Sequence, residues 1–213
     1  MRVKKLDWEI EKKGLKEDLC KILVRVGALK FGTFTLTNGH LSPYYINLRI
    51  VPSFPDVFVK ICSIYSRLIE KEVGIASFKR FAGIPLSAIP YASCLSFNLK
   101  KPLVLVRKEV KEIGRERRIE GILMPGDRVL PVDDIITTGG NLSSTVKALR
   151  GEGAVVEKAV VLVDREEGGV EKLRNEGVTV YSLMSVAEAA ETLYELNVLS
   201  KEEYDAILLQ RKK

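Results

Sequence analysis

Short apolar runs that alternate with helical stretches limit the fold of this chain more than any other feature of its sequence. The runs are residues 81–84, 103–106, 129–132, 160–163 and 178–181. Helical stretches fall between several of them, notably around residues 143–150 and 170–175. Strands that are apolar along their whole length and alternate with helices are typical of a parallel sheet covered on both faces. The pattern therefore predicts an α/β fold with a doubly wound, mostly parallel sheet.

One residue of the third run conflicts with a regular central strand. Pro131 has no N–H to donate to a neighbouring strand, and prolines in sheets normally lie at edges or bulges. The sequence does not indicate how the sheet accommodates Pro131.

The N-terminal part of the chain has a different pattern, which predicts a small helix and strand extension. Apolar residues from Leu15 to Val26 recur at helical spacing and indicate an amphipathic helix that ends near Gly27. Residues 34–36 and 45–48 look extended and are joined through turn residues at 38–39 and 42–43. A second helix should begin at Pro55 and Asp56.

The domain organisation follows from the absence of a linker. A last helix is expected over residues 201–209 with Ser200 as its N-cap. No Pro/Gly/Ser-rich stretch separates two parts of the chain. We therefore expect a single domain over residues 1–213, with residues 1–50 as an N-terminal hood and residues 51–213 as the α/β core and C-terminal helices.

Several classes of protein are disfavoured by composition. No apolar run approaches the roughly 20 residues that span a bilayer. Charged residues follow the basic residues 1–5, so the start does not resemble a signal peptide and we expect a cytoplasmic location. Cys20, Cys62 and Cys94 are far apart among apolar neighbours, which favours buried free thiols. His40 is the only histidine, which excludes a histidine-rich metal site and argues against a Ser-His-Asp hydrolase.

The positive charge of the chain is concentrated in one region and indicates an anionic partner. The formal net charge is +6, and basic residues crowd one short segment: Lys100, Lys101, Arg107, Lys108, Lys111, Arg115, Arg117 and Arg118. Such a cluster suits nucleic acid or a small polyphosphate, and by itself it does not choose between them.

The segment from Val129 to Asn141 carries the chemistry. An apolar strand leads into Asp133 and Asp134, then into a Thr-Thr-Gly-Gly turn at residues 137–140 and a helix. Ligands of doubly wound sheets bind where strands end. Glycines allow close approach of an anion, and the amides and dipole at a helix start favour negative charge. The Thr137 and Thr138 hydroxyls add donors, so the turn suits one phosphate.

The two carboxylates need a different partner, because they would repel a phosphate. Asp133 and Asp134 are suited to accept hydrogen bonds from sugar hydroxyls and to stabilise positive charge that develops on a ribose ring. A strand that ends in two acids with no ligand is the alternative, and it carries a desolvation cost. A sugar phosphate accounts for both halves of the segment.

This segment resembles the signature with which type I phosphoribosyltransferases bind phosphoribosyl pyrophosphate (PRPP). The resemblance implies that fold, with ribose hydroxyls on Asp133 and Asp134 and a 5′-phosphate in the turn. The implied PRPP ligands in this segment are Asp133, Asp134, Ile135, Ile136, Thr137, Thr138, Gly139, Gly140 and Asn141.

Further segments are similar to those of orotate phosphoribosyltransferases, including the corresponding half of bifunctional UMP synthases. Residues 31–39 and 42–49 resemble the N-terminal region of that family, residues 107–111 and Gly114 its catalytic loop, and residues 163–169 its orotate-recognition segment. The likeness runs from about residue 29 to residue 186 in the same order and spacing. The chain stops where a decarboxylase would begin, so a monofunctional enzyme is expected.

The resemblance also implies how orotate is bound. Arg165 would meet the orotate carboxylate, for which a planar guanidinium is suited, with Thr137 near the same ring and Tyr45 and Ile46 lining the base pocket. The alternatives from the residues alone are a surface salt bridge of Arg165 with Glu166 or Glu167, and core packing for Tyr45.

Loop cations would bind the leaving pyrophosphate. The resemblance assigns this role to Arg107, Lys108 and Lys111, with Lys111 catalytic beside Asp133 and Asp134. Arg107 and Lys111 would reach the partner subunit's site, which implies a homodimer. A solvated basic face is the alternative for this loop, and it is the expected role of Arg115, Arg117 and Arg118.

The expected reaction is displacement of pyrophosphate at the ribose anomeric carbon by an orotate nitrogen, giving orotidine 5′-monophosphate in pyrimidine biosynthesis. It would proceed through a cationic state without a covalent enzyme intermediate. Mg²⁺ should bind mainly through PRPP oxygens and water, with no dedicated protein ligand. Neither nucleic acid nor a membrane is an expected partner.

Three positions depart from the family pattern. Thr37 and Ser87 lie where many relatives carry lysine, and Ile113 lies where many carry histidine. These changes should weaken PRPP binding unless Arg115 or Arg117 compensates. Two other functions stay open: a phosphoribosyltransferase for another base, and a PRPP-sensing regulator that binds nucleic acid. Arg165 disfavours the first, and the lack of a visible DNA-binding module disfavours the second.

Overall fold

The computed structural model describes residues 2–35, 39, 41–108 and 118–210. The chain divides into two compact units. One comprises Met1–Ile64 with Leu183–Lys213, and the other comprises Tyr65–Ser182. The expectation of a single domain over residues 1–213 stays a prediction. None of the described helices is both long enough and apolar enough to cross a membrane.

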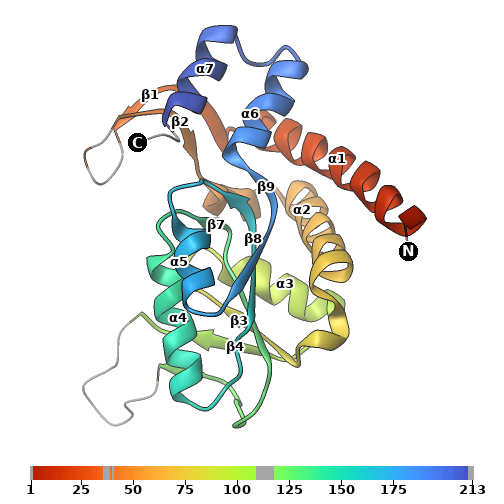
Figure 1. Cartoon of the computed structure of the whole chain (residues 1–213), viewed down its shortest axis with the longest axis vertical. Helices are drawn as coiled ribbons and strands as arrows, with labels where there is room; N and C mark the ends of the chain where they lie inside the picture. The colour runs from red at the N-terminus through yellow and green to blue at the C-terminus, as the bar shows by residue number, and fades with distance from the viewer. Residues whose placement is uncertain (1, 36–38, 40, 109–117, 211–213) are drawn as a thin grey trace. The chain divides into compact units, whose positions relative to one another are not determined.

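The unit from Tyr65 to Ser182 is built on the predicted sheet, which Figure 1 shows. Its strands run in the order β5-β4-β3-β6-β8-β7, and β9 also pairs with β8. The pairs β3–β4, β3–β6, β6–β8 and β7–β8 are parallel, and β4–β5 is antiparallel. The strand bounds are β3 Arg80–Gly83, β4 Leu103–Val106, β5 Ile119–Glu120, β6 Val129–Val132, β7 Ile135–Ile136, β8 Lys158–Asp164 and β9 Thr179–Ser185. The predicted mostly parallel sheet is confirmed.

Helices cover the sheet because every residue of β6, and residues 159–163 of β8, are apolar and buried. α4 (Gly140–Gly151) and α5 (Gly169–Asn175) lie against one face, while α3 (Ile89–Leu99) packs on β3 and β4 from the other (Figure 1). The core under α4 joins Val146 and Leu149 to the strand residues Ala82, Val104 and Val161. Short helical segments η2 (Ile69–Val73) and η3 (Ile75–Ser77) precede β3.

Pro131 is accommodated by an interruption of one ladder. It pairs in register with Ala82 of β3. On the other side, β6 pairs with β8 only at Val132 and Val160, and the preceding bridge joins Arg128 to Val155. The offset between the two strands grows by one residue across this gap. The missing N–H of Pro131 thus lies at an irregularity, where prolines are tolerated.

The other unit contains the N-terminal helix, a hairpin and the C-terminal helices. α1 spans Arg2–Arg25, and Gly27 after it adopts a φ of 69°, so the predicted helix end is confirmed. β1 (Leu29–Thr35) and β2 (Leu41–Ile46) pair antiparallel. The extended segment predicted at 45–48 is wrong at its end: Leu48 begins the 3-10 helix η1 (Leu48–Ser53), because the Asn47 side chain accepts from the Arg49 amide.

Three further helices complete the description, and each begins where the sequence provides a start signal. α2 runs from Pro55 to Leu68, as predicted. α7 (Lys201–Gln210) has the predicted cap at Ser200, whose hydroxyl accepts from the Glu203 amide at 3.2 Å. α6 (Val186–Glu195) opens with a capping box between Ser185 and Glu188.

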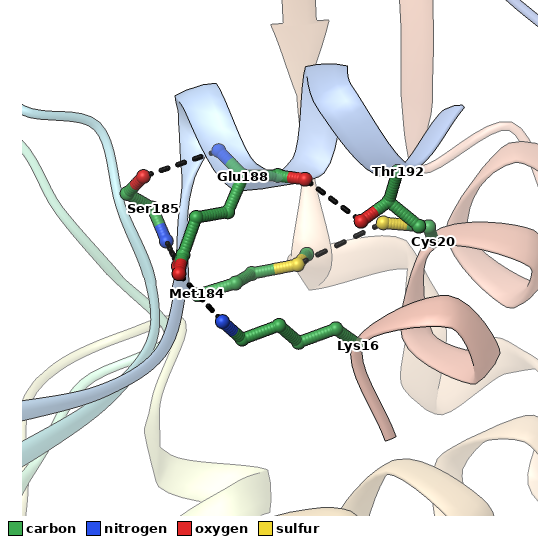
Figure 2. Close-up of polar contacts among 6 residues, drawn as sticks. All are labelled: Lys16, Cys20, Met184, Ser185, Glu188 and Thr192. Atoms are coloured by element: carbon green, nitrogen blue, oxygen red, sulfur yellow. Dashed lines mark hydrogen bonds and ion pairs between the residues drawn. The ribbon is translucent and has the colours of Figure 1, made fainter. Parts of the chain in front are cut away.

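The contacts of α1 with β9 and α6 explain the environment of Cys20 (Figure 2). Lys16 Nζ lies 2.6 Å from Glu188 Oε1, and Cys20 Sγ lies 3.7 Å from Met184 Sδ. Burial raises the pKa of the Cys20 thiol to about 12. Cys20 and Cys62 are buried free thiols as predicted, whereas Cys94 is only partly buried.

Candidate active site

The two acidic residues and the glycine turn come together at the end of β6, as predicted. β6 ends at Val132, Asp133 and Asp134 follow, and the turn leads into α4. The turn encloses a cavity of about 140 Å³. Its lining comprises Asp133 and residues 135–142. Asp133, the turn and the first helical residues therefore line the same cavity.

Glycines are required in this turn because two chain segments meet here. Gly139 adopts a φ of 73°, and its Cβ would lie 2.8 Å from Leu173 Cδ2. A Cβ on Gly169 would lie 2.3 Å from the Thr137 carbonyl oxygen, to which the Gly169 amide donates at 2.9 Å. Side chains at either position would push the start of α5 away from the turn.

The start of α4 offers amides to an anion. Gly139 is the N-cap residue and has no side-chain cap, so the first helical N–H groups, from Gly140 to Leu142, lack the usual capping acceptor. These residues line the cavity, together with the Thr138 and Asn141 side chains. A phosphate would supply the missing acceptor, and the helix dipole favours its charge.

Asp133 is buried, with 7% of its surface exposed. Its amide donates to the Val160 carbonyl oxygen at 3.0 Å, and its carbonyl oxygen accepts from the Tyr65 hydroxyl. Burial, and then the neighbouring Asp134 charge, raise the pKa of Asp133 well above its ordinary value. Such a carboxylate lacks solvation in the free protein, so ligand hydroxyls would improve its environment.

Asp134 is hydrogen-bonded to Ser87, one of the three positions that depart from the family pattern. Its Oδ1 accepts from the Ser87 hydroxyl at 2.9 Å and from the Ile135 amide at 3.0 Å. Its carbonyl oxygen accepts from the Leu162 amide at 3.1 Å, which fixes the residue against β8. Ser87 therefore lies in the site, where its hydroxyl orients one of the two carboxylates.

A second cavity of about 250 Å³ lies beside the first, and three residues of the basic cluster line it: Arg107, Lys108 and Arg118. Asn141 lines both cavities. The other residues around it are Ile84, Pro85, Arg107, Lys108, Arg118, Ser144 and Thr145. Arg107 forms an ion pair with Glu120. The structure thus brings Arg107 and Lys108 together as predicted, while Lys111, Thr37, Ile113, Arg115 and Arg117 lie outside the described residues.

The prediction that Arg118 belongs to a solvated face is wrong. Its side chain is partly buried and donates to the Arg107 carbonyl oxygen and to Ser144 Oγ. A run of basic residues around a loop is usually solvated, and the sequence carried no signal that one of them contacts a helix 26 residues further along.

Arg165 lies at the end of β8, and its amide donates to the Ile136 carbonyl oxygen at 3.0 Å. Its NH2 group lies 2.8 Å from Glu167 Oε1, yet only 12% of the Arg165 side chain is exposed. The predicted ion pair with Glu167 is present, but its arginine is not a surface residue. The preceding Asp164 has a pKa raised by burial.

The base-pocket candidates Tyr45 and Ile46 lie on β2, in the unit that contains the hairpin. The Tyr45 ring packs near Phe34, with ring centroids 5.7 Å apart. Their proposed role toward orotate stays a prediction. Among the described residues, no group of three or more His, Cys, Asp or Glu side chains is arranged to hold a metal ion.

Sequence reasoning missed Tyr65 as a residue that supports the site. It placed Tyr65 on the apolar side of α2, which is correct, since the side chain is fully buried. Its hydroxyl donates to the carbonyl oxygens of Asp133 and, at 3.1 Å, Val160. A buried tyrosine hydroxyl normally finds a partner, and that rule could have indicated a supporting role without naming the partners.

Comparisons with known proteins agree with this geometry. Residues 65–185 match the family model described as phosphoribosyl transferase domain. The chain is 39% identical over 174 residues to an orotate phosphoribosyltransferase of Methanothermobacter thermautotrophicus, covering 82% of this chain and 93% of the relative. A crystal structure of orotate phosphoribosyltransferase from Aeropyrum pernix superposes with a TM-score of 0.73 at 33% identity, covering 85% of this chain and 99% of the other.

A longer relative matches along only part of its length. The uridine 5′-monophosphate synthase of Caenorhabditis elegans is 36% identical over 195 residues, which cover 91% of this chain but 39% of the relative. The sheet and the match over residues 65–185 define a type I phosphoribosyltransferase. Within that class, the identity along almost the whole of its archaeal relative shows that the chain belongs to the orotate phosphoribosyltransferase family.

Proposed function

We propose that this chain catalyses the Mg²⁺-dependent transfer of the phosphoribosyl group from PRPP to orotate, with release of pyrophosphate, in pyrimidine biosynthesis. One observation carries the proposal: buried Asp133 borders the same cavity as the amides at the start of α4. Carboxylates and an anion-binding turn at the same strand end together suit a sugar phosphate. The carboxylates alone would not bind the phosphate, and the turn alone would not bind the sugar.

The 5′-phosphate would lie in the turn cavity. Support comes from the uncapped start of α4 and from Gly139 and Gly169, which keep side chains out of the turn. The Thr138 hydroxyl and the amides of Gly139, Gly140 and Asn141 are the donors of this proposed subsite, with Ile135, Ile136 and Thr137 shaping its wall.

Asp133 and Asp134 would hold the ribose hydroxyls and stabilise the positive charge that develops at the anomeric carbon. The raised pKa of Asp133 reflects its burial and the neighbouring charge of Asp134. Positive charge that develops on the ribose lowers the free-energy cost of burying ionised Asp133 and of placing it beside the Asp134 charge. The interaction therefore strengthens as the reaction proceeds. Ser87 keeps Asp134 in position.

The leaving diphosphate would meet Lys108, which lines the second cavity of its own chain, and the Arg107 and Lys111 side chains that the other subunit of a homodimer contributes. Mg²⁺, when bound through PRPP oxygens and water, would neutralise part of this charge. We further propose a cytoplasmic homodimer in which Arg107 and Lys111 act at the partner's site, with Lys111 catalytic.

Orotate would be recognised by Arg165. Its guanidinium is mostly buried and already forms an ion pair with the Glu167 carboxylate, so the site is suited to a planar carboxylate. Thr137 lies one residue after Ile136, to which the Arg165 backbone is bonded. Tyr45 and Ile46 are proposed to line the base.

A direct assay tests this function. Orotate absorbance should fall when enzyme, PRPP and Mg²⁺ are combined, and Asp134→Asn and Lys111→Ala should each slow this by about 100-fold or more. Arg128→Ala provides a charge-matched control, because Arg128 is exposed and pairs only with Glu157 among the described side chains. Turnover of adenine or uracil instead of orotate would contradict the proposal, as would full activity in both site variants.

A further inference from the structure

Arg118 connects two segments of the chain that border the second cavity. Its Nε donates to the Arg107 carbonyl oxygen at 2.9 Å, and its terminal NH2 group donates to Ser144 Oγ on α4 at 3.1 Å. The Arg107 amide donates in return to the Arg118 carbonyl oxygen at 2.7 Å, beside the antiparallel pair of Val106 and Ile119. The guanidinium is therefore fixed between the end of β4 and α4.

The charge of this guanidinium is not balanced by a carboxylate within the described residues. Arg107 has Glu120 as its ion-pair partner, whereas the described contacts of Arg118 are with a carbonyl oxygen and a hydroxyl. A partly buried cation whose acceptors are neutral is stabilised by an anion. Its two hydrogen bonds also leave donors free, because a guanidinium has five N–H groups.

The space next to Arg118 suits a group with several negative charges. The cavity of about 250 Å³ is far larger than one water, which occupies about 30 Å³ in the liquid. Lys108 lines the same cavity and is exposed. Thr145 adds a hydroxyl from α4, and Asn141 connects the cavity to the turn proposed for the 5′-phosphate.

We propose that Arg118 is a ligand of the diphosphate group of PRPP and of the pyrophosphate product, and that it also holds the Arg107 backbone in place. This inference rests on the proposed function. It replaces the expectation that Arg115 or Arg117 supplies the charge missing at Thr37, Ser87 and Ile113. Lysine could not perform both tasks, since one ammonium group cannot reach the carbonyl oxygen, the hydroxyl and an anion in the same fixed fork.

Pyrophosphate binding measured by titration calorimetry in the presence of Mg²⁺ tests the proposal. Arg118→Ala should raise the dissociation constant for pyrophosphate by about tenfold or more, since a charge-assisted hydrogen bond is lost. Arg118→Lys should give an intermediate value, and the exposed Arg128→Ala should bind within about twofold of the wild type. Inorganic phosphate, which should bind the turn alone, should keep its affinity in Arg118→Ala.

Steady-state kinetics separate a ligand from a residue that only supports the fold. Arg118→Ala should raise the KM for PRPP and leave the KM for orotate unchanged, and Ser144→Ala should show the same split to a smaller degree. Equal effects on both substrates, or pyrophosphate affinity in Arg118→Ala within about twofold of the wild type, would overturn the proposal. If Arg118→Ala does not fold, the pyrophosphate affinities and the two KM values of Arg118→Lys and Ser144→Ala test the proposal in the same way.

Failure of this inference is distinguishable from failure of the proposed function. A wild-type protein that binds neither PRPP nor pyrophosphate would contradict the function itself. A wild-type protein that binds both, with variants of Arg118 that bind equally well, would contradict only the role of Arg118.

Discussion

Arg165 and Glu167 form an ion pair of 2.8 Å in which the arginine is nearly buried and the glutamate is one-third exposed. The glutamate therefore supplies negative charge to a guanidinium that is poorly solvated. In the proposed function, the orotate carboxylate meets this same guanidinium. The two carboxylates then repel each other across one arginine, so Glu167 should oppose orotate binding.

Glu167→Gln should lower the KM for orotate by up to about fivefold, since the competing carboxylate is one-third exposed and such ion pairs contribute about 1 kcal/mol or less. The KM for PRPP should not change. Glu171→Gln is the matched control, since Glu171 forms an exposed ion pair with Arg174 on α5. A rise in the orotate KM would show that Glu167 orients Arg165 and does not compete with the substrate.

Asp133→Asn should stabilise the ligand-free protein at neutral pH while it abolishes activity. Burial raises the pKa of this carboxyl in the folded state. The folded state therefore binds the proton more tightly than the unfolded state, and ionisation destabilises it as pH rises above the unfolded value of about 3.9.

Thermal unfolding at two pH values checks this prediction. At pH 7 the variant should melt higher than the wild type, by about 2–4 °C for each kcal/mol of destabilisation removed. Near pH 4 the difference should shrink, since the wild-type carboxyl is then protonated in the folded state. A variant that melts lower at pH 7 would show that the ionised Asp133 stabilises the fold.

Gly169→Ala should damage both the phosphate turn and the stability of the unit. The added Cβ would meet the Thr137 carbonyl oxygen at 2.3 Å, and such overpacking costs about 1–3 kcal/mol. Gly151→Ala is a control with nothing within 4 Å of its Cβ, and it should be neutral or slightly stabilising. Calorimetric melting and PRPP binding measure the two effects, and equal behaviour of the two variants would contradict this account of the turn.

Shared active sites predict complementation between inactive subunits. Lys111→Ala and Asp134→Asn homodimers should each be nearly inactive. Mixed dimers contain one site with neither change if Lys111 acts across the interface, so co-refolded subunits should recover about a quarter of the wild-type activity, because half of the dimers are mixed and one site in each is intact. No recovery in verified mixed dimers would place Lys111 in its own subunit's site.

The fold was predictable because its strands are buried on both faces and are therefore apolar throughout. Residues 129–132 and 160–163 could be assigned as strands from this property alone. The loss of regularity at Pro131 could not be located, because it depends on the offset between β6 and β8. Leu48 was assigned wrongly because a local side-chain bond from Asn47, not periodicity, decides its conformation.

The site was predictable where its residues are consecutive and not where they meet through the fold. Asp133 to Asn141 form one strand end and turn, so their proximity follows from the chain. Tyr65 contacts Asp133, and Arg118 contacts Ser144 on the helix that follows the turn, and both contacts join residues far apart in sequence. The sequence neighbours of Arg118 do not distinguish it from a solvated arginine. Its contact with Ser144, which only the structure reveals, does so.

The most direct test of the central claim is a titration of the ¹⁵N-labelled protein with PRPP and Mg²⁺, followed by amide NMR. The largest changes in chemical shift should fall on the amides of Thr138, Gly139, Gly140 and Asn141, and ribose 5-phosphate should shift the same amides while free ribose should not. Unchanged chemical shifts for the amides of this turn at saturating PRPP would contradict binding of the 5′-phosphate there.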